Sequence, residues 1–300
     1  LEKGTFNLPK NITVYSLGKE TGVSKLDYIK NFYHYLFLIK GSYDKVFIHM
    51  NEEYVLLAGL YWIMKRIPIY LWRNHPDGSI KTRIAVAIST KVFCTSTSSF
   101  TARFSKTIIM PAGIDTKMFK PVEGLVRGKY SVCMVGRISP IKHIDIALQA
   151  VKILVSKGVQ ISLNIIGPVL NRDLEYFESL KKYVEANNLS NTISFKDAVT
   201  GDKLPSIYSS HEICLNLTDS GSFDKTIVEA SSCGAMPLVS NSSLSSFLPI
   251  VCITDSLPEE IAQSLQKLFE PKEQVKIQKE LRDFVESQSL SELSKKLLLE

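Results

Sequence analysis

Short runs of β-branched and aromatic residues recur through the first part of the chain, and most are bounded by polar residues or proline. Such runs are typical of strands, and they predict strands at residues 11–17, 45–50, 67–72, 91–96 and 106–111. Helical patterns lie between several of these runs, for example at residues 25–39. Apolar strands that alternate with helices are typical of parallel sheets, so this part of the chain predicts an α/β domain.

A stretch rich in proline, glycine and charge, KPVEGLVRGK at residues 120–129, interrupts this pattern and predicts a hinge. A second alternating series follows, with a helix that should end at Gly158 and further helices from Pro258 onward. Its strands are expected at residues 131–136, 161–167, 192–199, 213–218 and 236–241. The predicted fold is therefore α/β, with two Rossmann-like, doubly wound domains that face each other across a cleft. Ligands in such sheets bind at the carboxyl ends of the strands, which makes the cleft the expected site.

The composition is that of an ordinary globular chain with room for two domains: 300 residues, 45% hydrophobic and 22% charged. A net charge of +6 is compatible with a small anionic ligand or with acidic lipid head groups. Nucleic acid is not an expected partner, because no dense run of Lys and Arg with interleaved aromatic residues occurs.

The five cysteines lie singly in apolar or small-residue runs, so they predict neither a metal site nor a disulfide framework. No apolar run reaches membrane-spanning length, and no signal peptide is apparent. We therefore expect a cytoplasmic protein. The chain begins at Leu1 rather than Met, which leaves open whether it is a fragment.

The segment VGRISPIKH, residues 135–143, joins an expected strand to an expected helix. Gly136 permits a close approach of the backbone to a ligand, Arg137 offers a planar fork for phosphate oxygens, and Lys142 adds a compact positive charge. These residues predict an anion site at the strand's carboxyl end. A solvated basic loop explains them equally well.

A second candidate segment is TDSGSFDKTIVEA, residues 218–230. Gly221 and Ser222 predict a turn, and a helix beginning near Asp224 should present free backbone N–H groups to an anion. Glu229 lies on the same helix, where its carboxylate can accept hydrogen bonds from ribose hydroxyls. The alternative is a helix cap followed by an exposed acid.

His75 follows an expected strand in LWRNHPDG, which makes it a candidate for chemistry, although a structural histidine is as plausible. His49, at the end of another strand, is a weaker candidate. The segment LGKET lacks the glycine spacing of a phosphate loop, and no GxGxxG occurs, so neither a P-loop nor a dinucleotide site is expected.

The order of these segments resembles the retaining glycosyltransferases of family four, which have the GT-B fold. The resemblance rests on MPAGIDTKMF (110–119), VGRISPIKHID (135–145), LNIIGP (163–168) and TDSGSFDKTIVEASSCGAMPLVS (218–240). It covers essentially the whole chain and is most specific over residues 131–241.

The resemblance implies that Arg137 and Lys142 hold the diphosphate of a nucleotide sugar, and that Glu229 binds its ribose. His75 would lie near the anomeric carbon. The remaining donor-binding positions that it implies are Gly136, Gly167, Ala198 and Val199, together with the backbone of Gly221, Ser222, Phe223, Asp224 and Lys225.

Two departures from the family pattern matter. The first acid of the family's E-x7-E pair falls on Gly221, and Asp224 is the nearest replacement. The usual first strand and glycine-rich loop have no counterpart before Asn11, so we expect an incomplete N-terminal domain. The expected domains are residues 1–121, residues 122–284, and a C-terminal helix at 285–300 that returns toward the first domain.

The implied function is transfer of a hexose from a UDP-sugar or GDP-sugar to a hydroxyl acceptor in the synthesis of cell-surface glycans or glycolipids. No Asp-x-Asp is present to hold a metal, and no cofactor is expected. The basic, aromatic segment YWIMKR (61–66) permits a peripheral contact at the inner face of the membrane and a lipid-linked acceptor, although a packed helix is the simpler explanation. A non-catalytic or impaired nucleotide-sugar-binding protein and a sugar-nucleotide epimerase of the same fold are the alternatives.

Overall fold

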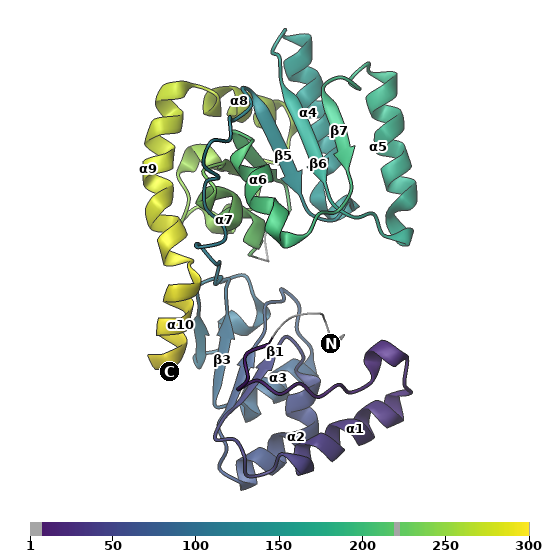
Figure 1. Ribbon diagram of the computed structural model, residues 1–300, viewed down its shortest axis with the longest axis vertical. Coiled ribbons are helices and arrows are strands. Elements are labelled where there is room, and N and C mark those ends of the chain that lie inside the picture. The colour runs from purple at the N-terminus through teal and green to yellow at the C-terminus, as the bar shows by residue number, and fades with distance from the viewer. Residues whose placement is uncertain (1–7, 219–222, 300) are drawn as a thin grey trace.

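A computed structural model describes residues 8–218 and 223–299 of the chain. Figure 1 shows two α/β units stacked along the long axis of the molecule, with the N-terminal unit below and the C-terminal unit above. Each unit is built on its own parallel sheet. The α/β fold class expected from the sequence is confirmed.

The N-terminal sheet has the strand order β1-β2-β3-β4, and all of its neighbours pair in parallel. Its strands are β1 (Val46–His49), β2 (Ile69–Trp72), β3 (Lys91–Cys94) and β4 (Thr107–Ile109). Three helices pack near it: α1 (Lys25–Leu38), α2 (Glu53–Met64) and α3 (Ile80–Ile88). Alternate residues of β2 serve the two faces of the sheet, since Ile69 and Leu71 belong to the core beneath the helices while Tyr70 and Trp72 belong to a second apolar cluster.

The strand expected at residues 11–17 is not formed. These residues lie in a turn and an irregular segment, where Ile12, Val14 and Tyr15 are exposed. The β-branched composition of this segment favours an extended backbone, but a strand also needs a neighbour for its N–H and C=O groups. Among the described residues β1 pairs only with β2, so the prediction for this segment was wrong.

The C-terminal sheet has the order β7-β6-β5-β8-β9 and is doubly wound, with its switch point between β5 and β8. The strands are β5 (Ser131–Val135), β6 (Ser162–Ile166), β7 (Ile193–Lys196), β8 (Ile213–Asn216) and β9 (Met236–Val239). The connecting helices are α4 (Ile144–Ser156), α5 (Leu174–Ala186), α6 (Leu204–Ser209) and α7 (Lys225–Ser232), and α8 (Pro258–Leu268) follows. Helix α4 packs against α5 and α8, while α7 packs against α6 and against α9 (Pro271–Ser287).

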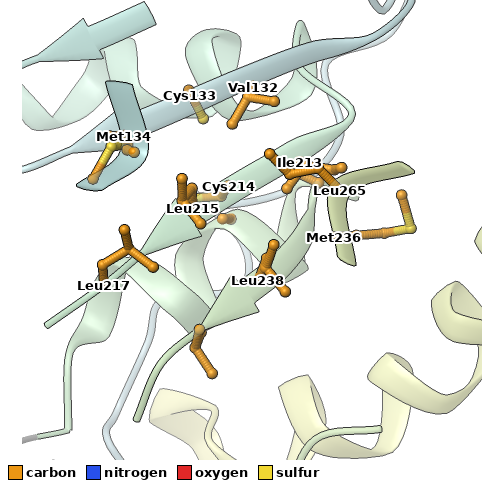
Figure 2. Packing of buried hydrophobic residues seen from close by; sticks show 14 of the residues in the cluster. Val132, Cys133, Met134, Ile213, Cys214, Leu215, Leu217, Met236, Leu238 and Leu265 are labelled. Atoms are coloured by element: carbon orange, nitrogen blue, oxygen red, sulfur yellow. The ribbon is translucent and has the colours of Figure 1, made fainter. Parts of the chain in front are cut away.

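The central strands of this sheet are apolar on both faces, as expected for a sheet covered by two layers of helices. Figure 2 shows Val132 of β5, Ile213 of β8 and Leu238 of β9 in this core, with Leu265 of α8 packed nearby. The five cysteines are free and buried.

Two C-terminal helices, α9 (Pro271–Ser287) and α10 (Leu290–Leu299), run along one side of both units (Figure 1). The chain returns to the linker between the units at Gln288, whose carbonyl accepts the N–H groups of Gly113 and Ile114, both at 3.0 Å. Leu293 and Leu297 of α10 then pack against the Tyr70 side of the N-terminal sheet. Within the described part of the chain, no helix is long and apolar enough to cross a membrane.

The segment before the expected hinge belongs to the C-terminal core: Ala112, Ile114 and Phe119 are buried in the same cluster as β5 and β8. The carboxylate of Asp115 accepts the N–H of Lys117 at 3.0 Å and so fixes this turn. The MPAGIDTKMF motif therefore joins the two units structurally. The boundaries at 121 and 284 stay predictions.

Gly113 provides a test of this junction. Its backbone has a φ of +72°, and a Cβ atom there would lie 2.3 Å from Cδ2 of Leu293. We expect Gly113→Ala to cost about 1–2 kcal/mol of backbone strain and about 1–3 kcal/mol of overpacking against α10. The matched control is Gly124→Ala, where φ is +75° and nothing lies within 4 Å of the added atom. Thermal unfolding of both variants measures the difference, and equal melting temperatures would contradict the described seating of α10.

Candidate functional site

The candidate site lies at the switch point of the C-terminal sheet, where two glycines bring neighbouring loops together. Gly136 follows β5 and donates its N–H to the carbonyl of Ile166 at 3.0 Å. A Cβ atom on Gly167 would lie 1.9 Å from the carbonyl oxygen of Gly136, so only glycine fits there. The loop after β5 is therefore held directly against the end of β6.

Arg137 leaves this loop with an exposed side chain. It lines a small pocket at the carboxyl end of β5, together with Gly136, Lys142 and Asn216. The guanidinium has no ion-pair partner among residues 8–218 and 223–299. The structure thus brings Arg137 and Lys142 to one pocket, as the sequence predicts.

Lys142 ends a short 3-10 helix, Pro140–Lys142, and reaches across the switch point to the segment after β8. Its Nζ lies 2.6 Å from Oδ2 of Asp224 and donates to Oγ1 of Thr218 at 2.9 Å. The two side chains of the ion pair are only 20% and 17% exposed. A half-buried ion pair therefore joins the β5–α4 loop to the start of α7.

Asp224 is the N-cap of α7. Its Oδ1 accepts the backbone N–H of Thr226 at 3.2 Å and the Thr226 hydroxyl at 2.9 Å. Asn216, the last residue of β8, donates its amide to Oδ2 of Asp224 at 2.8 Å. The sequence predicts free N–H groups here, whereas the structure already places a carboxylate of the protein on one of them.

Burial alone would raise the pKa of the Asp224 carboxyl. The charge of Lys142 and the hydrogen bonds from Lys142, Asn216 and Thr226 outweigh burial and lower this pKa below its ordinary value. Asp224 is therefore a carboxylate at neutral pH.

Glu229 lies further along α7, where its Oε2 accepts the hydroxyl of the buried Tyr208 at 3.2 Å. Burial raises the pKa of Glu229, and the nearby charge of Asp224 acts in the same direction, while the Tyr208 hydrogen bond opposes them. Its side chain is half-buried, so the alternative of an ordinary exposed acid does not describe it.

A pocket of about 440 Å³ lies between the two units and has a size suited to a small ligand. Phe223 and Lys225 at the start of α7 line its C-terminal side. The N-terminal sheet, the linker and α10 supply the rest: Phe47, His49, Met50, Trp72, Asn74, Thr95, Ala112, Leu293 and Leu297.

The two candidate histidines occupy different places. His49 lines the interdomain pocket, where burial and then the charge of Lys225 lower its pKa. His75 lies on the exposed loop after β2 and is not among the lining residues. Its Nδ1 lies 3.0 Å from the backbone nitrogen of Asp77, which fixes the ring on that loop.

The other predicted positions also lie near carboxyl ends of strands or outside the described residues. Ala198 and Val199 follow β7 and are exposed, and their expected contact with the base stays a prediction. Gly221 and Ser222 lie outside the described residues. In the described part of the chain, no group of three or more His, Cys, Asp and Glu side chains is placed to hold a metal.

Sequence reasoning did not single out Asn216, Thr218 and Tyr208, which hold Asp224, Lys142 and Glu229 in place. For Asn216 and Thr218 a signal exists, because both are polar residues at the carboxyl end of an otherwise apolar strand. For Tyr208 there is none, since its partner lies on a different helix.

Several solved structures share this fold. HepE from Anabaena, crystallised with UDP and glucose, superposes with a TM-score of 0.74 at 16% identity, covering 95% of this chain and 82% of that chain. Sucrose-phosphate synthase from Thermosynechococcus elongatus gives 0.71 at 16% identity, covering 91% and 76%. The C-terminal domain of LpcC from Francisella tularensis, a glycosyl transferase group 1 family protein, gives 0.53 at 22% identity, covering 58% and 96%. At these levels of sequence identity, the similarity to these structures shows a shared fold and nothing further.

No curated protein sequence matches this chain. The family model of the glycosyl transferases group 1 matches residues 115–297, which include β5, β8, α7 and every candidate residue of the C-terminal sheet. The match spans more than half of the chain, so the protein belongs to the glycosyl transferases group 1 family.

Proposed function

We propose that this protein transfers a hexose from a nucleotide diphosphate sugar to a hydroxyl acceptor, with retention of anomeric configuration and without a metal ion. The observation that carries the proposal is the meeting of Arg137, Lys142 and the start of α7 at the sheet's switch point, beside an interdomain pocket. Cleavage of a sugar–phosphate bond builds negative charge on the departing diphosphate. Fixed donors aimed at that charge lower the barrier, each by about 3 kcal/mol.

Lys142 is suited to this role even though it is paired. An ammonium group has three N–H donors, and Thr218 and Asp224 accept two of them. The third can serve a diphosphate oxygen. The two existing contacts hold Nζ in one place, so little reorganisation is needed when the ligand binds.

Arg137 and Lys225 supply the positive charge that this pair does not. Asp224 compensates the charge of Lys142, whereas the guanidinium of Arg137 and the ammonium of Lys225 have no ion-pair partner in the part of the chain that the structure describes. We therefore assign the net attraction for the diphosphate to Arg137 and Lys225, and its local positioning to Lys142 and the backbone around Phe223 and Asp224.

Asp224 is also the proposed replacement for the missing acid at position 221. It lies at the junction between the anion-binding residues and the interdomain pocket, because its neighbours Phe223 and Lys225 line that pocket. Oxygen atoms of a carboxylate accept hydrogen bonds from sugar hydroxyls. Its existing donors limit how many further bonds it accepts, which restricts the hexoses that fit.

For the donor base, we propose uracil. The neighbouring fold of HepE has been crystallised with UDP and with UDP-glucose, which supports a UDP-sugar over a GDP-sugar. Glu229 would hold the ribose, and the base would lie near Gly167, Ala198 and Val199.

For the transfer step, we propose that the acceptor hydroxyl attacks from the face that the diphosphate leaves, and that a diphosphate oxygen takes its proton. His75 then positions the sugar rather than acting as an obligatory base. The acceptor belongs to cell-surface glycan or glycolipid synthesis, at the cytoplasmic face of the membrane.

Lys142→Met tests the leaving-group role. We expect turnover of UDP-sugars, measured as release of UDP, to fall about 100-fold or more, because one fixed donor to the diphosphate is lost. The single change also leaves the Asp224 carboxylate without its charge partner, so the double variant Lys142→Met/Asp224→Asn is measured beside it. Asn caps a helix as well as Asp does, and the double variant should fold normally yet stay inactive.

Lys157→Met, on an exposed lysine after α4, is the matched control and should keep full turnover. Recovery of activity in the double variant would show that Lys142 only neutralises Asp224. If the intact protein binds UDP but releases none from any UDP-sugar or GDP-sugar, it is a binding protein. A rearranged nucleotide sugar as the product would instead identify an epimerase.

His75→Ala tests the assignment of the N-terminal histidine. We expect kcat to fall about 100-fold with a small change in donor KM, because the side chain acts on the reacting sugar. His49→Ala is the comparison, since His49 lines the pocket without the role proposed for His75. A large loss in His49→Ala together with an unaffected His75→Ala would transfer the role to His49.

Glu229→Gln tests two things separately: how the charge of Glu229 affects the stability of the fold, and whether Glu229 contributes to UDP binding. A carboxyl whose pKa is raised in the folded protein binds its proton more tightly there than in the unfolded chain. Stability therefore falls as pH rises from the unfolded pKa through the folded one, and the neutral amide removes this loss.

We expect Glu229→Gln to melt at a higher temperature than wild type at pH 7.5, with a smaller difference at pH 4.5, and to bind UDP more weakly. Glu185→Gln, on the exposed face of α5, is the control and should change neither property. A lower melting temperature for Glu229→Gln at pH 7.5 would contradict the sign of the shift, and unchanged UDP affinity would remove Glu229 from the ribose site.

A further inference from the structure

The outer faces of α1 and α2 carry apolar side chains that the fold does not cover. Helix α2 buries Val55 and Trp62 against the N-terminal sheet. On its opposite side Leu60 and Met64 are 71% and 75% exposed, and Ile63 is 49% exposed. In the segment at 61–66, Trp62 is buried in the N-terminal core and Tyr61 packs against that core, whereas Ile63 and Met64 are exposed.

The end of α1 extends this surface. Phe37 is about half exposed, and its ring contacts the ring of Tyr61 with centroids 5.9 Å apart. Leu38 beside it is also exposed. We call these five residues the apolar face: Phe37, Leu38, Leu60, Ile63 and Met64. Single exposed apolar residues are common, but a group that spans two adjoining helices marks an interaction surface.

A basic pocket of about 460 Å³ borders the apolar face. Lys40, Lys65 and Arg66 line it, together with Tyr43, Tyr61 and the single acid Asp44. None of the three cations has an ion-pair partner among the described residues. The pocket therefore presents excess positive charge beside exposed apolar side chains.

Arg66 occupies this pocket at a conformational cost. It follows the end of α2 with a φ of +57°, in the left-handed region where glycine is the usual residue. Nothing in the packing of the described residues explains an arginine there. The substitution Arg66→Gly removes the positive charge and also relieves the strain of the left-handed backbone.

We propose that the apolar face docks on an anionic phospholipid bilayer, with Leu60 and Met64 entering the boundary between head groups and acyl chains and with Lys40, Lys65 and Arg66 contacting lipid phosphates. Charge complementarity selects this partner, because apolar side chains flanked by basic ones are the pattern that binds acidic bilayers. A second copy of this chain fits less well, since a two-fold contact would bring the same basic pockets close together.

The docked orientation follows from the topology. Lys40, Lys65 and Arg66 precede strands β1 and β2, whereas the interdomain pocket lies at the carboxyl ends of those strands. In Figure 1, α1 and α2 lie at the end of the molecule remote from the C-terminal unit. Docking therefore holds the protein at the membrane with the candidate site at a distance from the lipid surface. The inference goes beyond the proposed function and does not depend on the donor.

Co-sedimentation of the full chain with vesicles tests the proposal. One set of vesicles contains phosphatidylcholine alone, and the other contains equal parts of phosphatidylcholine and phosphatidylglycerol. We expect binding to the anionic set at low salt and a marked loss in high salt. Arg66→Gly should bind about fivefold more weakly while melting at the same or a higher temperature. Leu60→Gln/Met64→Gln should bind about tenfold more weakly.

The matched controls are Val275→Gln, at a 73% exposed position on α9, and Lys157→Ala, and both should bind as wild type does. UDP affinity in solution should be the same in all of these variants, so a failure of membrane docking is distinguishable from a failure of the donor site. Equal binding to both sets of vesicles, absence of binding, or full binding by the two docking variants would each overturn the proposal. A dimer that Leu60→Gln/Met64→Gln abolishes, without vesicle binding, would assign the face to a second copy.

Discussion

The ion pair between Lys142 and Asp224 is the contact on which the candidate site depends. It joins the loop after β5 to the start of α7 across the switch point of the sheet, where the two chain segments diverge to opposite faces. Because both groups are largely removed from water, loss of either partner leaves a buried charge rather than a mere missing contact. The hydrogen bonds from Asn216 and Thr226 to the same carboxylate make the arrangement rigid. A site built in this way has its geometry set before any ligand arrives.

The site also depends on a second junction, where the chain crosses between the two units twice. The linker at Gly113 and Ile114 is hydrogen-bonded to Gln288, and α10 then packs on the N-terminal sheet. Residues of both units line the interdomain pocket, and Leu293 and Leu297 of α10 form part of its wall. The packing that seats α10 is therefore the packing that shapes the pocket. Any movement of one unit relative to the other must deform these contacts, which makes α10 the natural place for such motion to be resisted.

Much of the fold could be predicted from the sequence, because its strands are short apolar runs that alternate with amphipathic helices. The structure of the segment at 11–17 could not be predicted, because the local composition indicates only a preference for an extended backbone and does not show whether a partner strand is present. The basic loop after β5, which we propose binds the diphosphate, was predictable from Gly136, Arg137 and Lys142 in one segment. The partner of Lys142 was not, because Asp224 lies 82 positions away in sequence and only the winding of the sheet brings it near. Glu229 was a candidate from the sequence, but its contact with Tyr208 was not predictable, for the same reason.

The presence of Asp224 constrains how this site can bind an anion at all. A lysine that already faces a carboxylate attracts a diphosphate less strongly than a lone lysine does. In the proposed site, the long-range attraction is therefore assigned to Arg137 and Lys225, which line the pockets on either side of the pair. The pair contributes position and short-range hydrogen bonding instead. Glu229 is a further acid near this site. Burial raises its pKa, so the folded state disfavours its ionised form. Two carboxylates beside the proposed anion site lower stability or affinity unless they contact the ligand. The neutral hydroxyl groups of a sugar and a ribose are groups that carboxylates bind without charge repulsion, which is why the proposal assigns Asp224 and Glu229 to them.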